Sequence, residues 1–139
     1  MPRYEDIAPT VHIALRCERR LLDLRINERA RAMFDGGLVE EVEALIDQGI
    51  REGETAPRAI GYAQALAVID GTMSVPEAVD STALATRQLA SRQIKWFRRD
   101  PRLHWIDVAL TEAGQCTDSE RSRLTRQAWE LVCARRGVA

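Results

Sequence analysis

Six basic side chains within residues 87–102 form the part of this sequence best equipped to bind a charged ligand. Only one acid, Asp100, accompanies them, and the bases are Arg87, Arg92, Lys95, Arg98, Arg99 and Arg102. Like charges at this density repel one another unless a polyanion neutralises them. A guanidinium group can donate two parallel hydrogen bonds to one phosphate. The residue types therefore indicate a site for phosphate groups, such as those of RNA.

A helix must carry these cations if they are to act on one face. At about 100° per residue, five of them span about 140° of a helical wheel. Six apolar residues fall in the remaining sector and predict a packed face: Ala85, Leu89, Ala90, Ile94, Trp96 and Phe97. The only acid between Glu77 and Asp100 is Asp80, so i,i+4 ion pairs do not explain the arginines. A surface helix with solvated charges stays open as the alternative.

Arg29 interrupts the apolar stripe of a helix predicted over Glu18–Phe34. It shares a sector of the wheel with Leu22, Ile26 and Met33. An arginine in such a stripe either extends its charged end to solvent or is held inward to bind an anion. The sequence leaves both interpretations open.

Gly61 lies inside a helix predicted over Arg58–Asp70. A glycine there costs about 1 kcal/mol relative to alanine. We therefore expect either close approach by a ligand or backbone, or tight contact between two helices.

The rest of the chain is predicted to be mainly α-helical. Ser74 and Glu77 form a start signal for the long helix, which we expect to run to Arg99. Residues 50–57 are predicted as a polar loop. Further helices are predicted over Leu38–Gln48 and Asp118–Arg136, and short strands over Val11–Leu15 and His104–Val108. A strand over 11–15 needs a backbone partner. We expect it to be an orphan strand in this chain, which indicates that part of the structure is missing.

Composition limits the class of protein. The 139 residues are 45% apolar and 29% charged with a net charge of −1, which is ordinary for a globular protein. No apolar run reaches membrane-spanning length, and the first 30 residues contain no apolar segment typical of a signal peptide, so we expect a cytoplasmic protein with no membrane partner. Its three cysteines fit no zinc site and are expected to be free thiols: Cys17, Cys116 and Cys133.

Four blocks of this sequence, in order along the chain, resemble the signature sequences of tRNA dimethylallyltransferases. They match the patterns RIxxRxxxM, GLxxEV, RAxGYxQ and TRxxAxRQxxWxR, and lie at Arg25–Met33, Gly37–Val42, Arg58–Gln64 and Thr86–Arg98. The arginine-rich stretch 98–105 is similar to that of actinobacterial members. The blocks cover about residues 10–107, and four ordered motifs are far more specific than any one of them.

The resemblance implies the carboxyl-terminal, mainly α segment of a P-loop-type α/β enzyme, with one or two short strands. We assign residues 1–108 to this segment and leave the loop and terminal helix of 109–139 unassigned. The family transfers a dimethylallyl group from its diphosphate to the exocyclic amine of the adenosine 3′ of the anticodon. The implied partners are the tRNA anticodon loop and dimethylallyl diphosphate, with Mg2+ as the cofactor that assists departure of pyrophosphate.

The resemblance also implies residue roles, though none of them is catalytic or metal-ligating. Arg29 and Arg87 are expected to reach toward the diphosphate or the reaction channel. Ser91 stands where the family usually has Lys or Arg, so one phosphate contact is expected to be lost. The tRNA-binding positions are Arg58, Ala59, Ile60, Gly61, Tyr62, Ala63, Ser91, Arg92, Gln93, Ile94, Lys95, Trp96, Phe97 and Arg98.

The 139 residues contain no GxxxxGK[ST] loop, so they lack a backbone cradle for a diphosphate. We therefore expect a truncated chain or one part of a split enzyme, with an amino-terminal half elsewhere and no prenyl transfer by this chain alone. Two alternatives stay open. One is a tRNA-binding module without chemistry, and the other is a helical interaction protein or remnant.

Overall fold

The computed structural model describes residues 6–136, which form two compact units. The first unit combines the chain up to Leu22 with the chain from Arg92 onward, and the second unit is Asp23–Ser91. Two helices, α1 (Arg19–Asp35) and α4 (Val75–Phe97), begin in one unit and continue into the other. None of the helices within residues 6–136 is long and apolar enough to cross a membrane.

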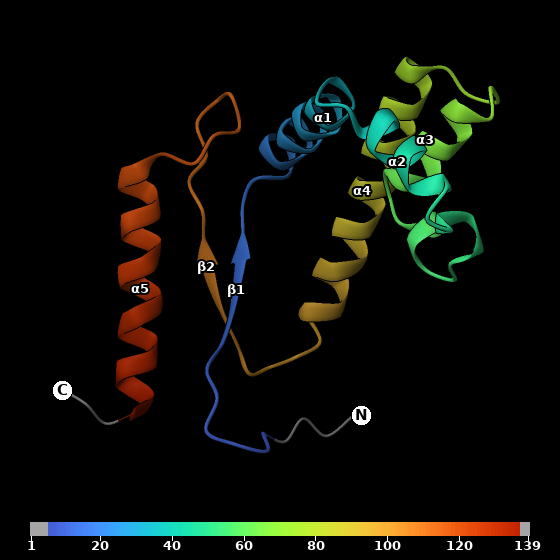
Figure 1. Ribbon diagram of the computed structural model, residues 1–139. Helices are drawn as coiled ribbons and strands as arrows, with labels where there is room; N and C mark the ends of the chain where they lie inside the picture. Colours follow the sequence, from blue (N-terminus) through green and yellow to red (C-terminus); the bar gives the residue numbers. More distant parts are fainter. Residues whose placement is uncertain (1–5, 137–139) are drawn as a thin grey trace. The chain divides into compact units, whose positions relative to one another are not determined.

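A parallel pair of strands forms the centre of the first unit. Strand β1 (His12–Arg16) pairs with β2 (Leu103–Asp107), and Ala14 lies opposite Trp105. Figure 1 shows the two strands side by side with α5 (Asp118–Arg136) beside them. Both strands were predicted within one residue of their bounds. The expectation that the first strand lacks a partner in this chain was wrong, because a strand far along the sequence supplies it.

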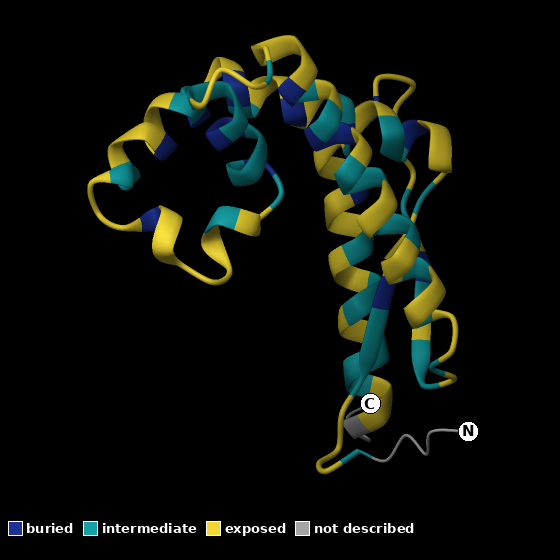
Figure 2. Ribbon diagram, turned by 90° about the vertical axis from the view of Figure 1, so that its right-hand side faces the viewer, coloured by how far each residue is buried: buried dark blue, intermediate teal, exposed yellow. Residues whose placement is uncertain are grey.

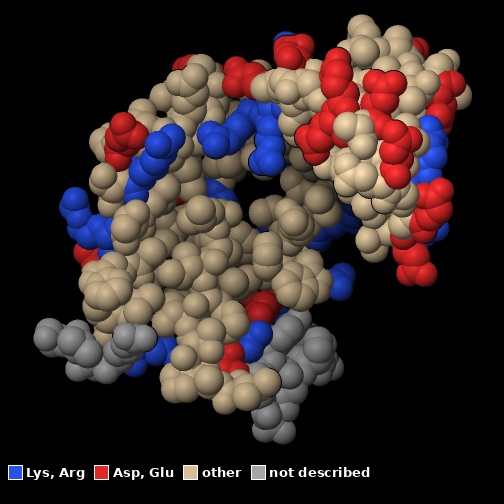
Figure 3. Space-filling view, in the orientation of Figure 1, with Lys and Arg blue, Asp and Glu red and all other residues tan. Residues whose placement is uncertain are grey.

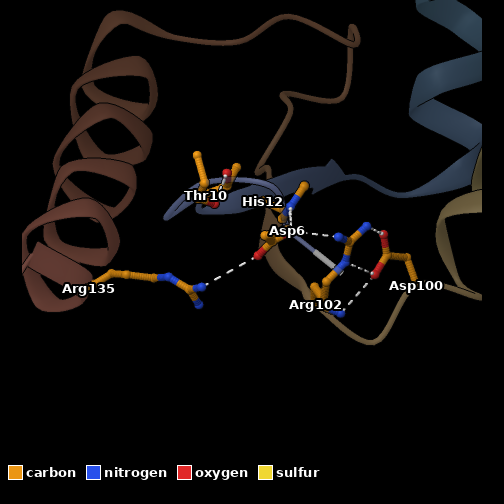
Figure 4. A network of polar contacts seen from close by, with 7 residues as sticks. Asp6, Thr10, His12, Asp100, Arg102 and Arg135 are labelled. Carbon is orange, nitrogen blue, oxygen red and sulfur yellow. Dashed lines mark hydrogen bonds and ion pairs between the residues drawn. The ribbon is translucent and has the colours of Figure 1, made fainter. Parts of the chain in front are cut away.

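A network of polar side chains centred on Asp6 ties the ends of several elements in the first unit together (Figure 4). The carboxylate of Asp6 lies 2.9 Å from the imidazole of His12 and accepts a hydrogen bond of 2.6 Å from Arg102. Arg135 of α5 approaches the same carboxylate at 3.5 Å. Arg102 also donates to Asp100 at 2.7 Å. The turn after α4 is therefore held by charge-assisted hydrogen bonds, which are the stronger kind.

The second unit has a small apolar core between its helices. The helices are α2 (Leu38–Ile46) and α3 (Tyr62–Ile69) with parts of α1 and α4. Figure 2 shows that buried and exposed positions alternate along these helices, as amphipathic sequences require. The buried core residues are Phe34, Leu38, Val42, Ile50, Ala65, Leu66 and Ala78.

The segment predicted as a polar loop contains two short 3-10 helices, η1 (Ile50–Glu52) and η2 (Ala56–Arg58). Ile50 is only 8% exposed, and its burial in the core fixes the first of them. Gly49, with a φ of 83°, makes the left-handed turn that precedes it. The two short helices were not predicted because the segment is mostly polar and only Ile50 buries its side chain in the core.

The start signal of α4 is confirmed. The backbone N–H of Ser74 donates to the Glu77 carboxylate at 2.8 Å, and the N–H of Glu77 lies 3.4 Å from the Ser74 hydroxyl. This is the reciprocal pair of a capping box. The helix ends at Phe97, two residues before the predicted end, which is within the ordinary uncertainty of helix boundaries. Helix α5 has the predicted bounds.

We expect the first unit to lose stability in acid. Hydrogen bonds from Arg102 and Arg123 lower the pKa values of Asp100 and Glu120, each to about 2. Carboxyl groups of an unfolded chain titrate near pH 4, so the unfolded state binds more protons between about pH 4 and pH 2. The stabilisation is present above that window and is lost as the pH falls through it. Urea unfolding followed by tryptophan fluorescence tests this, because all three tryptophans lie in the first unit.

The Glu120→Gln variant is the control for this experiment. Its urea midpoint is expected to lie below that of the original chain at pH 7, and the difference should shrink toward pH 2. A wild-type midpoint that stays constant from pH 7 to pH 2 contradicts the prediction.

Candidate nucleic-acid interface

Four exposed cations follow one another along the end of α4 and the turn after it. We call them the cation stretch: Arg92, Lys95, Arg98 and Arg99. Within residues 6–136 none of the four forms an ion pair. Arg102, the sixth base of the cluster, differs because Asp6 and Asp100 compensate its charge. The cation stretch therefore lies in the first unit as uncompensated positive charge, which attracts polyanions.

The apolar side of α4 is less packed than its wheel predicted. Trp96 is 60% exposed and Leu89 is 37% exposed, so the expectation of a continuous packed face was wrong. The Trp96 ring meets Phe97 edge-on, with ring centroids 5.2 Å apart. A helical wheel shows on which side of a helix a residue lies, but it does not show whether another element packs against that side. An exposed aromatic ring beside cations is the combination that binds unpaired bases of single-stranded RNA.

The remaining predicted residues of this block flank the cation stretch. Gln93 is exposed, whereas Ile94 and Phe97 are half-buried. The hydroxyl of Ser91 donates to the backbone oxygen of Arg87 at 3.0 Å, one helical turn earlier. The Ser91 side chain thus makes a hydrogen bond within its own helix.

The other predicted block, residues 58–63, forms a turn that leads into α3 in the second unit. Arg58 ends η2 and is exposed, and within residues 6–136 it makes no ion pair. Ala59 is extended and Ile60 is half-buried. Tyr62 and Ala63 are the first residues of the helix. The block therefore presents one exposed cation and a half-buried phenol on a short turn.

Gly61 precedes α3 instead of lying within a helix, so the predicted start at Arg58 was wrong. Its φ of 98° and ψ of −53° are open only to glycine. A Cβ at Gly61 would lie 3.1 Å from the Met33 methyl carbon and 3.5 Å from a Leu38 methyl carbon. The backbone angle requires glycine here, and a Cβ would also force the Met33 methyl group to move by a few tenths of an ångström. Of the two explanations expected for this glycine, the contacts favour tight packing between helices, because the neighbours are side chains of α1 and α2.

Two residues outside the predicted set hold this turn. The phenol of Tyr62 donates a short hydrogen bond to the carboxylate of Glu41 on α2, which raises the pKa of Tyr62. The Gln64 side chain accepts a hydrogen bond of 2.8 Å from the N–H of Gly61. Gln64 stands three residues after Gly61, the spacing of a capping box, so the sequence carried a signal for it. Glu41 lies 21 residues from Tyr62 and carried no such local signal.

The two residues expected to face the diphosphate both lie in the second unit. Arg87 is half-buried and donates a hydrogen bond to the side-chain oxygen of Asn27 on α1. Because an amide is neutral, this contact orients the guanidinium group without compensating its charge. Arg29 is exposed, so its charged end extends to solvent, where a ligand can reach it.

The structure thus brings together parts of three signature blocks in the second unit. Met33, Leu38 and Glu41 contact the turn formed by Gly61 and Tyr62. The cation stretch belongs to the first unit. Within residues 6–136 no group of three or more His, Cys, Asp or Glu side chains could hold a metal ion.

Comparison with known proteins gives consistent similarities. The family model described as IPP transferase matches residues 3–100. The chain is 50% identical over 122 residues to the tRNA dimethylallyltransferase of Pseudarthrobacter chlorophenolicus, covering 84% of this chain and 41% of that protein. It is 44% identical over 133 residues to the enzyme of the same name from Mycobacterium tuberculosis, covering 94% of this chain and 40% of that protein. The chain therefore spans about two fifths of the length of these two relatives.

A solved structure extends the similarity to the fold. The full-length tRNA isopentenylpyrophosphate transferase from Bacillus halodurans matches with a TM-score of 0.76 and 28% sequence identity. The match covers 95% of this chain and 42% of that one. It therefore reaches into residues 109–139, which the signature blocks left unassigned.

We expect Gly61→Ala to destabilise the second unit by about 2–3 kcal/mol, because the substitution adds backbone strain to a clash with Met33. The control is Gly71→Ala. Gly71 also has a positive φ, 69°, but its Cβ would meet nothing within 4 Å, so a loss of about 1 kcal/mol is expected. Urea unfolding followed by far-ultraviolet circular dichroism compares the two. Equal losses would show that packing at Gly61 contributes nothing.

Proposed function

Because the chain belongs to the IPP transferase family, whose model it matches over residues 3–100, we propose that it takes part in tRNA dimethylallyl transfer by holding the tRNA. In this reaction the exocyclic amine nitrogen of the adenosine 3′ of the anticodon bonds to the dimethylallyl carbon attached to the diphosphate. The carbon–oxygen bond breaks, its electron pair leaves with pyrophosphate, and the amine releases a proton. We propose that this reaction takes place in the cytoplasm.

The cation stretch is the observation that carries the proposal. Its four exposed charges have no ion-pair partner within residues 6–136, and it overlaps the fourth signature block. Phosphate oxygens of the anticodon loop would neutralise these charges and release counterions, a main source of affinity for nucleic acids. The exposed ring of Trp96 offers a surface on which an unpaired base can stack. The turn of residues 58–63 provides the second contact.

The diphosphate would meet arginine side chains of this chain. Arg29 and Arg87 are the residues that we propose to approach the diphosphate, since guanidinium groups suit its oxygens. The residues of 6–136 offer no cluster of ligands that fits Mg2+, so we assign this chain no part in holding the metal. The 139 residues contain no GxxxxGK[ST] loop to cradle a diphosphate. This chain's proposed part is therefore to bind and orient tRNA.

We expect the chain to bind tRNA with an affinity that falls as salt rises. Fluorescence anisotropy with labelled tRNA across a salt series measures it. Removing two phosphate contacts with Arg92→Ala/Arg98→Ala should weaken binding by about tenfold or more at low salt. It should also reduce the slope of log K against log salt by about 1 to 2.

A second double variant, Arg121→Ala/Arg126→Ala, removes the same charge from α5, outside the proposed site. Its affinity should stay close to that of the wild type. Equal losses in both variants would indicate unspecific attraction. Absence of wild-type binding at low salt would favour the helical interaction or remnant protein.

We expect no prenyl transfer by the 139-residue chain alone, because it has no backbone cradle for the diphosphate. The chain is mixed with dimethylallyl diphosphate, Mg2+ and unmodified tRNA, and the digested tRNA is analysed by mass spectrometry. A full-length relative assayed in parallel is the positive control. Detection of the prenylated nucleoside would refute this prediction, whereas tRNA binding without product fits a module that holds tRNA.

A further inference from the structure

The hydrogen bond between Glu41 and Tyr62 joins two helices at the turn proposed to contact tRNA. Glu41 lies in the first turn of α2, and Tyr62 is the first residue of α3. The phenol donates to the carboxylate, and a hydrogen bond to a charged acceptor is stronger than a neutral one. Tyr62 is half-buried, so its ring packs on one side while its hydroxyl is tied to α2.

A second set of contacts fixes the residue before Tyr62. Gln64 accepts the hydrogen bond from the Gly61 N–H at 2.8 Å, and its amide nitrogen lies 3.4 Å from the Ser81 hydroxyl on α4. Gly61 is also packed against Met33 and Leu38. The backbone of the turn is thus held by Gln64, and the side chain of Tyr62 is held by Glu41.

Glu41 is negatively charged, although it lies beside a turn that is proposed to contact RNA. Three exposed acids lie on α2, namely Glu40, Glu41 and Glu43, and a fourth, Asp47, directly follows it. Figure 3 shows acidic side chains gathered over the second unit. An acid beside an RNA contact repels phosphates. Its removal should therefore strengthen RNA binding, unless the acid does something that outweighs the repulsion.

We propose that Glu41 is a positioning residue that fixes Tyr62 in its RNA-contacting orientation before tRNA arrives. The inference rests on the proposed function, in which residues 58–63 contact tRNA. A tyrosine that is already oriented loses less side-chain freedom on binding, and such preorganisation raises affinity. Glu41 itself touches no RNA in this scheme and acts through the phenol of Tyr62.

The test compares neighbouring acids of the same helix turn, both in the first turn of α2. Glu40→Ala removes a charge without disturbing Tyr62, so tRNA affinity should stay the same or rise slightly. Glu41→Ala should weaken binding by about threefold to tenfold, although it removes the same repulsive charge. Glu41→Gln keeps an oxygen that accepts the phenol hydrogen bond and should bind at least as well as wild type.

Tyr62→Phe removes only the hydroxyl and checks the same contact from the other side. It should reproduce the loss of Glu41→Ala, and the double variant should lose no more than either single variant. In a Tyr4→Phe background Tyr62 is the only tyrosine. Its ultraviolet titration should then shift to lower pH in Glu41→Ala. Thermal melting checks that each variant is folded, and if Glu41→Ala fails to fold, Glu41→Gln and Tyr62→Phe decide.

The outcomes distinguish failure of the positioning role from failure of the proposed tRNA binding. If the wild type binds tRNA but Glu41→Ala binds as tightly as Glu40→Ala, Glu41 has no positioning role. Additive losses in the double variant, or a tyrosine titration that Glu41→Ala leaves unchanged, overturn the inference as well. If the wild type does not bind tRNA, the proposed function fails and the inference fails with it.

Discussion

The backbone angle at Gly61 is the constraint on which the arrangement of the second unit depends. With a φ of 98°, the chain turns sharply from η2 into α3, and the turn brings Gly61 against Met33 and Leu38. Tyr62 then falls within reach of Glu41. A side chain at Gly61 would oppose both the angle and the packing. Three of the four signature blocks therefore meet because one residue has no side chain.

The first unit depends on a different constraint, the pairing of strands from distant parts of the sequence. Parallel strands cannot be joined by a tight turn and need a long crossover, and here α1 to α4 all lie between β1 and β2. The Asp6 network reinforces the pair, since Arg102 precedes β2 directly and His12 begins β1. The cation stretch ends where this network starts. Its last charges are thus followed by a turn with a fixed geometry.

Sequence reasoning succeeded where the deciding contacts are local. The capping pair of Ser74 and Glu77 and the bounds of α5 depend on neighbours within a few residues. It failed where the partner lies far along the chain. The strand over 11–15 was left unpaired because its partner is about ninety residues away. Trp96 was assigned to a packed face and is in fact exposed. Helical periodicity shows on which side of the helix a residue lies, but it does not show whether another element packs against that side.

In the candidate site, too, features that depend on local sequence could be predicted, and contacts between distant residues could not. The cluster of cations could be found from residue type and spacing alone. The compensation of Arg102 could not, because one of its partners, Asp6, lies 96 residues away. Glu41 could not, because its role depends on a contact across 21 residues, although it stands in a signature block. A net charge of −1 conceals this organisation: the acids gather on α2 and the free cations on the end of α4. RNA binding by such a chain must then be local, with attraction at the cation stretch and at Arg58. The positioning role proposed for Glu41 accounts for an acid beside the second contact, since the charge of that acid alone works against the ligand.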